Sequence, residues 1–367
     1  MNVLHLATHV DIGGITSYIA TLSKAMAKKG HKSSVISSGG NAWAFLTRSG
    51  VLCYDHLIRT KSEFNLRLWW SLPQIVSLVK QEHYDILHAH SRVTQVLAFF
   101  VSKLTGVPVV STAHGFYKPR IGRRLFPAWG KRVIAISPLV AESLEKDHHV
   151  PARKIRMVQN AIDLESFSRR LGQQDKESLR LRYGVPKEAF TVGTLSRLVK
   201  DKGHEYLIEA VRQVSAVHPN VFLLIVGDGR EKEALKKQTA QTLPGRSKMI
   251  PGVQDTTAVL KMMDCFAHPA TWREGFGLSI AEAMVAKLPV LATDIPAINT
   301  LLVDGQNGCV VKPKDAAMLA GALNGLIRDP ELARRLAEKG HETAVSLCRP
   351  ERMADEVEKV YREVVGI

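Results

Sequence analysis

Short apolar segments alternate with amphipathic segments along almost the whole chain. Val3–Ala7 predicts a buried strand, and apolar residues then recur at helical spacing between Thr16 and Lys29. Gly30 is a natural end for this helix, and Ser33–Ser37 predicts the next strand. Helical stretches separate further β-rich runs at 85–89, 107–112 and 132–136. This alternation is typical of a parallel sheet with helices on both faces.

A second series of the same kind begins near Ala189. Phe190–Thr194 and Val221–Val226 predict strands, and His204–Val217 between them predicts a helix. Further segments predict a strand at 265–268, a helix at 279–287 and a strand at 289–292. We therefore expect an α/β fold of two doubly wound Rossmann-like domains that face across a deep cleft. Ligands bind such sheets at the carboxyl ends of the strands.

The length also indicates two domains, because 367 residues exceed what one hydrophobic core usually supports. The first domain is expected to cover 1–168 and to be completed by a C-terminal helix at 352–367. The polar, charge-dense segment 169–188 is the best linker candidate, and the second domain is expected to cover 189–351.

Positive charge is concentrated in the first half of the chain. The net charge is +15, and residues 1–171 hold 23 Lys and Arg against 10 Asp and Glu, whereas the remainder holds 27 against 25. This asymmetry favours an anionic partner such as a membrane surface, a nucleic acid or a phosphorylated acceptor. A basic surface that simply maintains solubility is the alternative.

The cysteines and the apolar runs point to the cytoplasm. Four cysteines lie far apart without a CxxC pair, which offers neither a zinc cage nor a disulfide framework. The first residues run directly into the strand-like segment, and no run approaches the roughly 20 apolar residues of a membrane span. We expect a cytoplasmic protein, with peripheral contact to the inner membrane face as a further hypothesis.

The segment from His268 to Met284 has the strongest chemical signal. A strand is followed by a loop that contains Gly275 and Gly277, and a helix is expected from Ser279. The free N–H groups of Gly277, Leu278 and Ser279 would form an anion site at that helix start. Alternatively, Ser279 and Glu282 form a capping box that needs no ligand.

Other loops after predicted strands offer weaker signals. Arg197 and Lys202 flank the loop that follows 190–194 and could hold a diphosphate, or they are ordinary solvated residues. Gly13-Gly14 and Gly227-Asp-Gly229 either allow close approach to a ligand or form turns.

Histidines follow two β-rich runs of the first half. His88, His90 and His114 occupy these positions, but no carboxylate partner or ligand spacing indicates a metal site. We favour a substrate contact for His114.

Seven segments in one order resemble the retaining glycosyltransferases of family 4 (glycosyl transferases group 1), which have the GT-B fold. The resemblance covers almost the whole chain. The segments are Gly13-Gly14, Gly30-His31, 112–115, 160–163, 193–203, 227–229 and 274–284 with Pro289-Val290. It implies transfer of a sugar from a nucleotide diphosphate sugar to an acceptor hydroxyl, in lipopolysaccharide, glycolipid or polysaccharide synthesis.

The resemblance also implies residue roles. Arg197 and Lys202 would neutralise the donor diphosphate without a metal or other cofactor, while Glu274 and His114 would lie beside the donor sugar. Glu282 would bind the ribose and Val253 would contact the base through its backbone. The remaining donor-binding positions are Gly13, Gly14, Gly227, Gly275, Phe276, Gly277, Leu278 and Ser279. The sequence departs from the family at Lys287, where glycine is usual, near Thr300, where glutamate is common, and at 269–272.

The basic first half would face the acceptor. Five positions combine cations with an aromatic ring: Lys118, Arg120, Arg123, Arg124 and Trp129. This mixture suits an anionic membrane surface and a lipid-linked acceptor, although Trp129 and the pair Trp69-Trp70 could equally be core residues.

Two other function classes are alternatives. A nucleotide-sugar epimerase can share the architecture, and a nucleic-acid-binding protein would explain the charge. The chain shows no zinc finger, helix-turn-helix spacing or RNA-stacking motif, so nucleic acid is not an expected partner.

Overall fold

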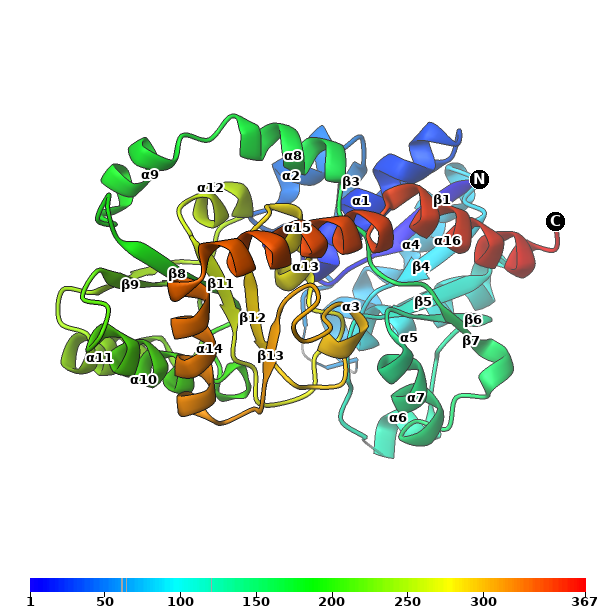
Figure 1. Ribbon diagram of the computed structural model, residues 1–367. Helices are drawn as coiled ribbons and strands as arrows, with labels where there is room; N and C mark the ends of the chain where they lie inside the picture. The colour runs from blue at the N-terminus through cyan, green and yellow to red at the C-terminus, as the bar shows by residue number, and fades with distance from the viewer. Residues whose placement is uncertain (61, 64, 120) are drawn as a thin grey trace. The chain divides into compact units, whose positions relative to one another are not determined.

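The computed structural model describes residues 1–60, 62–63, 65–119 and 121–367, and it divides into two compact units. Unit 1 consists of Met1–Ala161 with Arg349–Ile367, and unit 2 consists of Ile162–Cys348. Each unit contains one parallel sheet covered by helices (Figure 1). None of the helices in the described residues combines the length and the apolarity that a membrane span requires.

The sheet of unit 1 has the strand order β3-β2-β1-β4-β5-β6-β7, and all neighbours are parallel. Its strands are β1 Asn2–Leu6, β2 Lys32–Ser37, β3 Leu52–Asp55, β4 Ile86–Ala89, β5 Val109–Ala113, β6 Arg132–Ala135 and β7 Ile155–Met157. Its helices are α1 Gly14–Lys28, α2 Trp43–Arg48, α3 Leu66–Trp70, α4 Leu72–Gln81, α5 Arg92–Thr105, α6 Ile121–Leu125, α7 Pro138–Lys146, the 3₁₀ turn η1 Ala152–Lys154 and α16 Pro350–Val365.

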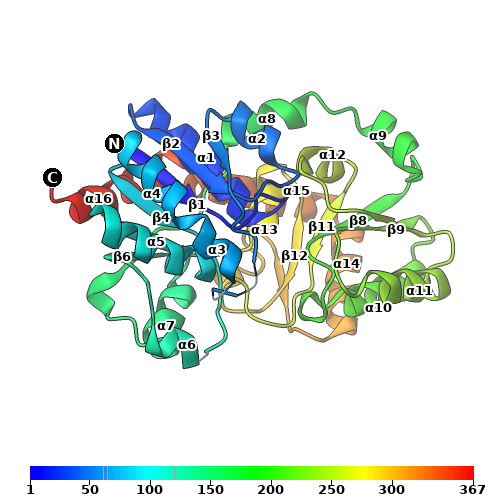
Figure 2. The ribbon, with the colours of Figure 1, turned by 180° about the vertical axis from the view of Figure 1, so that it is seen from behind.

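Two apolar clusters cover the two faces of this sheet. On one face, Ile19 and Leu22 of α1 pack with Val357 and Tyr361 of α16. On the other face, α4 and α5 bury a second set of apolar side chains, and the rear view shows these helices in front of the sheet (Figure 2). Because the spacing of apolar residues gives each helix one buried stripe, the sheet is closed on both sides.

The sheet of unit 2 has the order β10-β9-β8-β11-β12-β13 and is also parallel. Its strands are β8 Phe190–Leu195, β9 Val221–Val226, β10 Ser247–Ile250, β11 Cys265–His268, β12 Val290–Thr293 and β13 Cys309–Val311. Its helices are α8 Leu164–Gly172, α9 Lys176–Tyr183, α10 His204–Ser215, α11 Lys232–Thr242, α12 Thr256–Lys261, α13 Leu278–Val285, α14 Ala316–Arg328 and α15 Pro330–Leu347, with 3₁₀ turns η2 Lys200–Lys202 and η3 Ile298–Thr300. In each unit the strand order reverses beside the first strand, which is where such sheets bind ligands.

The segment 169–188 is not a linker, so this prediction is wrong. It contains the end of α8 and all of α9, and Arg180 of α9 is buried with 4% exposure. The Arg180 guanidinium donates to the carbonyl oxygen of Met262 at 2.8 Å and to the Asp264 carboxylate at 2.6 Å. Buried charge needs such partners, so the polarity that suggested a solvated linker instead ties the segment to unit 2. The chain leaves unit 1 after Ala161 and returns at Arg349.

Lys287, where the resemblance leads one to expect glycine, lies in a left-handed backbone conformation with φ 57°. It directly follows the α13 C-cap residue Ala286, and its N–H donates to the Met284 carbonyl oxygen while the Leu288 N–H donates to that of Ala283. This is the Schellman arrangement, in which glycine avoids the strain that a Cβ brings.

Replacing Lys287 by glycine should therefore stabilise unit 2. The strain relieved, about 1–2 kcal/mol, exceeds the extra entropy that glycine gives the unfolded chain, about 0.5–1 kcal/mol. We expect a rise of up to about 1 kcal/mol in the free energy of unfolding, measured by urea denaturation. Lys287→Ala, which keeps a Cβ, is the control and should bring no comparable gain.

Candidate active site

The loop between β8 and α10 carries Arg197 and Lys202 and is held against the end of β11. The Thr271 N–H donates to the Asp201 carbonyl oxygen at 2.9 Å. Gly203 has φ 63°, and a Cβ there would lie 2.1 Å from the Pro269 carbonyl oxygen. This close approach requires glycine and brings the loop beside the segment that contains Glu274.

Lys202 forms an ion pair with Glu274, and both side chains are 14% exposed. The Glu274 carboxylate also accepts a hydrogen bond from His268 Nε2 at 3.0 Å. Burial keeps the pKa of His268 well below its ordinary value, so this imidazole is neutral. The structure thus brings together two predicted residues, Lys202 and Glu274, with a histidine that had been assigned no role.

Cationic charge is concentrated beside this cluster. Burial, followed by the charge of Arg197, lowers the pKa of Lys202 to about 8. The Arg197 side chain itself is exposed. The charge of Arg197 disfavours the protonated form of Lys202, and an anionic ligand would relieve this repulsion.

The helix α13 begins with unoccupied backbone donors. Its N-cap is Gly277 in a left-handed conformation, and no side chain caps it. Within the described residues, no acceptor is recorded for the N–H groups of Gly277, Leu278 and Ser279. The capping-box alternative is wrong, because Ser279 lies inside the helix and not at its N-cap. The preceding Phe276 is buried at 3% exposure and, with Gly275, completes the loop.

Glu282 lies one turn into α13 in an environment that the sequence did not reveal. Burial raises the pKa of its carboxyl group to about 7. This effect outweighs the hydrogen bond with Thr256 and the charge of Arg170, which both lower the pKa. Arg170 forms an ion pair with Asp255 at 3.1 Å. A carboxyl group with this pKa can both donate and accept a hydrogen bond near neutral pH.

Gly227 and Asp228 contact two neighbouring loops of unit 2, one with Arg197 and one with Val253. A Cβ at Gly227 would lie 1.9 Å from the Ser196 carbonyl oxygen, in the loop that carries Arg197. The Asp228 carboxylate accepts a hydrogen bond from the Gly252 N–H at 2.7 Å, which orders the backbone next to Val253. Gly227 is therefore required by packing.

In unit 1, Gly13 and Gly14 begin α1, and a Cβ at either position would meet no atom within 4 Å. His114 follows β5 and is partly buried. Its Nε2 lies 2.9 Å from Nδ1 of His90, a buried histidine that follows β4. The strand ends thus place His114 next to the histidine that follows the neighbouring strand.

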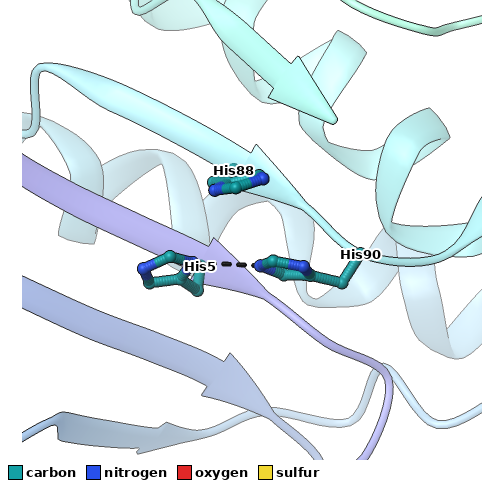
Figure 3. Close-up of side chains that lie close together, drawn as sticks. All are labelled: His5, His88 and His90. Carbon is teal, nitrogen blue, oxygen red and sulfur yellow. Dashed lines mark hydrogen bonds between the residues drawn. The ribbon is translucent and has the colours of Figure 1, made fainter. Parts of the chain in front are cut away.

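Buried histidines gather at the carboxyl ends of β1 and β4 (Figure 3). One ring nitrogen from each of His5, His88 and His90 lies within 4.8 Å of the other two, which is close enough to ligate one metal ion. Five of their six nitrogens, however, already have hydrogen-bond partners: His5 Nδ1 and His90 Nε2 at 3.0 Å from each other, His90 Nδ1, and both nitrogens of His88. A metal would have to break these bonds, so hydrogen bonding accounts for the cluster better than coordination does.

Two of the residues predicted to form a membrane or acceptor surface are not on the surface. Arg123 and Trp129 are buried, and the Arg123 guanidinium lies 4.3 Å from the centre of the Tyr117 ring and 4.6 Å from that of Trp129. Cation–π contacts hold this arginine inside the unit. Lys118 and Arg124 are exposed, whereas Arg120 lies outside the described residues.

The chain matches two family models that together cover most of its length. The model described as Glycosyltransferase Family 4 matches residues 12–166, and the model described as Glycosyl transferases group 1 matches residues 175–343. The chain belongs to glycosyltransferase family 4. These matches support neither the epimerase nor the nucleic-acid-binding alternative.

Relatives and solved structures agree with this membership. The chain is 28% identical to the UDP-Gal:alpha-D-GlcNAc-diphosphoundecaprenol alpha-1,3-galactosyltransferase of Escherichia coli, over 80% of this chain and 79% of that protein. It is 26% identical to the phosphatidyl-myo-inositol mannosyltransferase of Mycolicibacterium smegmatis, over 96% and 91%. The structure of Anabaena HepE in complex with UDP-glucose has a TM-score of 0.84 at 22% identity, over 99% of this chain and 100% of HepE. This glycosyltransferase therefore has the GT-B fold.

The buried histidines of unit 1 should make the stability of this glycosyltransferase depend on pH. Burial lowers the pKa of His5 and of His114 to about 3, and it keeps those of His88 and His90 well below the ordinary value. In the unfolded chain these groups take up protons below about pH 6.5, while in the folded chain they stay neutral. Their contribution to stability is therefore present above pH 6.5 and is lost as the pH falls from 6.5 towards 3.

Urea denaturation at pH 7.5, 6.5 and 5.5 measures this loss. Each of the four histidines should contribute about 1.4 kcal/mol per pH unit once the pH is well below 6.5. His88→Gln removes one of them and should reduce the slope. A free energy of unfolding that does not change over this range would contradict neutral burial.

Proposed function

We propose that this glycosyltransferase binds a nucleotide diphosphate sugar mainly through unit 2 and transfers the sugar with retention of configuration. The observation that carries the proposal is the cluster of Lys202, Glu274 and His268 beside Arg197. A site that holds two cations, one of them paired with Glu274, together with uncapped N–H groups at a helix start suits a diphosphate. The largely buried Glu274 carboxylate suits sugar hydroxyl groups.

Most of the predicted residues then have a task in the proposal. Arg197 and Lys202 neutralise the diphosphate, the start of α13 from Gly277 to Ser279 contacts phosphate or sugar, and Glu274 accepts hydrogen bonds from the sugar. Glu282, whose carboxyl group exchanges protons near neutral pH, binds the ribose hydroxyl groups. The backbone of Val253 contacts the base, and Gly14 and His114 of unit 1 contact the diphosphate and the sugar.

The chemistry follows from where charge develops. Cleavage of the anomeric bond leaves negative charge on the departing phosphate and positive character on the sugar ring. Preorganised cations at the phosphate lower this barrier, by a few kcal/mol for each contact. Because Arg197 and Lys202 supply that charge, the proposal includes no metal ion. The leaving phosphate assists removal of the proton from the acceptor hydroxyl, on the same face of the sugar.

Thermal unfolding with UDP, GDP, ADP and their hexose conjugates tests the donor site and identifies the base. We expect one nucleotide to raise the melting temperature, with the same shift in the presence of EDTA. Lys202→Met should weaken its binding roughly 10- to 100-fold, which is the worth of a charge-assisted contact. Lys200→Met, which removes an exposed lysine of the same loop, should change the affinity little. Loss of the shift in EDTA would contradict metal independence, and no shift with any nucleotide would contradict the donor site.

We further propose that the acceptor is a lipid-linked or polysaccharide acceptor of the cell envelope and that unit 1 contacts an anionic membrane. The names of both relatives include a lipid-linked or lipid acceptor group. In α6, Ile121 and Leu125 are 79% and 80% exposed, and Arg124 beside them is exposed as well. Exposed apolar side chains one turn apart with adjacent cations suit the interface of an anionic bilayer.

A pocket of unit 1 adds to this surface. It has a volume of about 640 Å³, and its lining combines Phe99 and Phe126 with Lys103, Lys131 and Lys154. The lining also includes Arg132 and Glu363, which form an ion pair, so its three lysines remain in excess and suit an anionic lipid.

Co-sedimentation with vesicles tests the membrane contact. Vesicles with phosphatidylglycerol should bind the protein at physiological salt, and pure phosphatidylcholine vesicles should not. Ile121→Glu with Leu125→Glu should weaken binding at least tenfold, because both charges would enter the interface. The matched control is Leu181→Glu with Val217→Glu, which changes two exposed apolar residues of unit 2 and should have little effect. Equal binding to both kinds of vesicle would exclude an electrostatic contact.

A further inference from the structure

Three histidines of unit 1 form a continuous hydrogen-bonded chain that ends at His114. His5 Nδ1 lies 3.0 Å from His90 Nε2, and His90 Nδ1 lies 2.9 Å from His114 Nε2 (Figure 3 shows the first of these bonds). His5 and His90 are each 1% exposed, whereas His114 is partly exposed. The chain therefore runs from the buried sheet to a side chain that a ligand can reach.

The number of protons on His90 couples the two ends of this chain. A neutral imidazole has one N–H donor and one acceptor nitrogen, and His90 uses both nitrogens. If His90 donates to His114, it must accept from His5, and His114 then has its proton on Nδ1. If the bonds run in the other direction, His114 has its proton on Nε2 and His5 also has its proton on Nε2.

The environment of His5 distinguishes these two arrangements. Among residues 1–60, 62–63, 65–119 and 121–367, the structure records no acceptor for Nε2 of His5. His5 is 1% exposed, so a proton on this nitrogen would have no protein acceptor and almost no access to water, an arrangement that folded proteins avoid. A proton on Nδ1 is bonded to His90. The arrangement in which every buried N–H of His5 and His90 is bonded therefore places the proton of His114 on Nδ1.

The neighbouring His88 belongs to a separate network. Its Nδ1 lies 2.6 Å from the Tyr361 hydroxyl and its Nε2 lies 2.7 Å from the Thr112 hydroxyl. Thr112 in turn donates to the Tyr18 hydroxyl at 3.4 Å. His88 is thus as buried as His5 and His90 but makes no hydrogen bond with them or with His114. It is therefore a matched control for substitutions of His5 and His90.

We propose that His5 and His90 are positioning residues that hold His114 in the tautomer protonated at Nδ1, so that His114 presents an N–H donor to an oxygen of the donor sugar. The sugar contact rests on the function proposed above, whereas the tautomer rests only on the hydrogen bonds between His5, His90 and His114. The other nitrogen of His114 is occupied by His90, which also fixes the orientation of the ring.

Long-range proton–nitrogen NMR of the full-length protein with ¹⁵N-labelled histidine tests the tautomer. The signals of His114 are assigned by comparison with His114→Asn. We expect its Nδ1 to be protonated in the wild-type protein and in His88→Gln. In His90→Phe, which removes both bonds, His114 should lose this preference. If His90→Phe fails to fold, His5→Phe is the second variant, because loss of the donor at the far end should yield a mixture of tautomers. A proton on Nε2 in the wild type would overturn the proposal, as would a tautomer that neither variant changes.

Binding measurements test the consequence for the sugar. The probes are the nucleoside diphosphate that stabilises the protein most and its hexose conjugate. His90→Phe should weaken the conjugate roughly five- to tenfold, the worth of one hydrogen bond, and should change the affinity for the free diphosphate less than twofold. Equal weakening of both probes would overturn the link between the chain and the sugar. If no nucleotide binds, the proposed function fails, and the NMR result still decides the tautomer.

Discussion

In a parallel sheet every strand ends at the same edge, and the candidate residues of each unit depend on this constraint. Pairing of β1, β4 and β5 brings His5, His88 and the residues that follow these strands to one edge of unit 1. Pairing of β8 with β11 does the same in unit 2, where the loops after the two strands hold Lys202 and Glu274 in contact. Residues about 70 positions apart in the sequence thus meet because their strands are neighbours.

The two edges differ in their electrostatics. In unit 1 burial keeps the histidines neutral, so their hydrogen bonds determine which nitrogen holds each proton. In unit 2 the side chains of Lys202 and Arg197 lie near the largely buried Glu274, and the helix start adds uncapped N–H groups. A neutral edge suits directional contacts with hydroxyl groups, whereas a cationic edge suits a diphosphate. The neutral edge and the cationic edge thus match the two parts of the proposed donor, its sugar and its diphosphate.

Several polar residues that looked like surface features are structural. Arg180 satisfies carbonyl oxygens and a carboxylate inside unit 2, and Arg123 lies between two aromatic rings in unit 1. Both arginines are buried because a planar guanidinium can be fully bonded or stacked. Composition alone assigned them to a linker and to a membrane surface, respectively, since charged residues are usually exposed.

The sequence by itself determined most of the elements and their order. Apolar runs such as Val221–Val226 and amphipathic spacing such as that of α10 depend on local periodicity, which a sequence displays directly. Short, partly exposed strands such as β3 and β7 escaped prediction because their burial pattern is weak.

The positions of Arg197, Lys202, Glu274 and Glu282 as polar residues in or beside loops after strands could also be inferred from the sequence and the family resemblance. Their surroundings could not: the contacts of Glu274 with His268, of Glu282 with Thr256, and of His114 with His90 were decided by tertiary structure, because strand pairing joins residues that no local pattern relates.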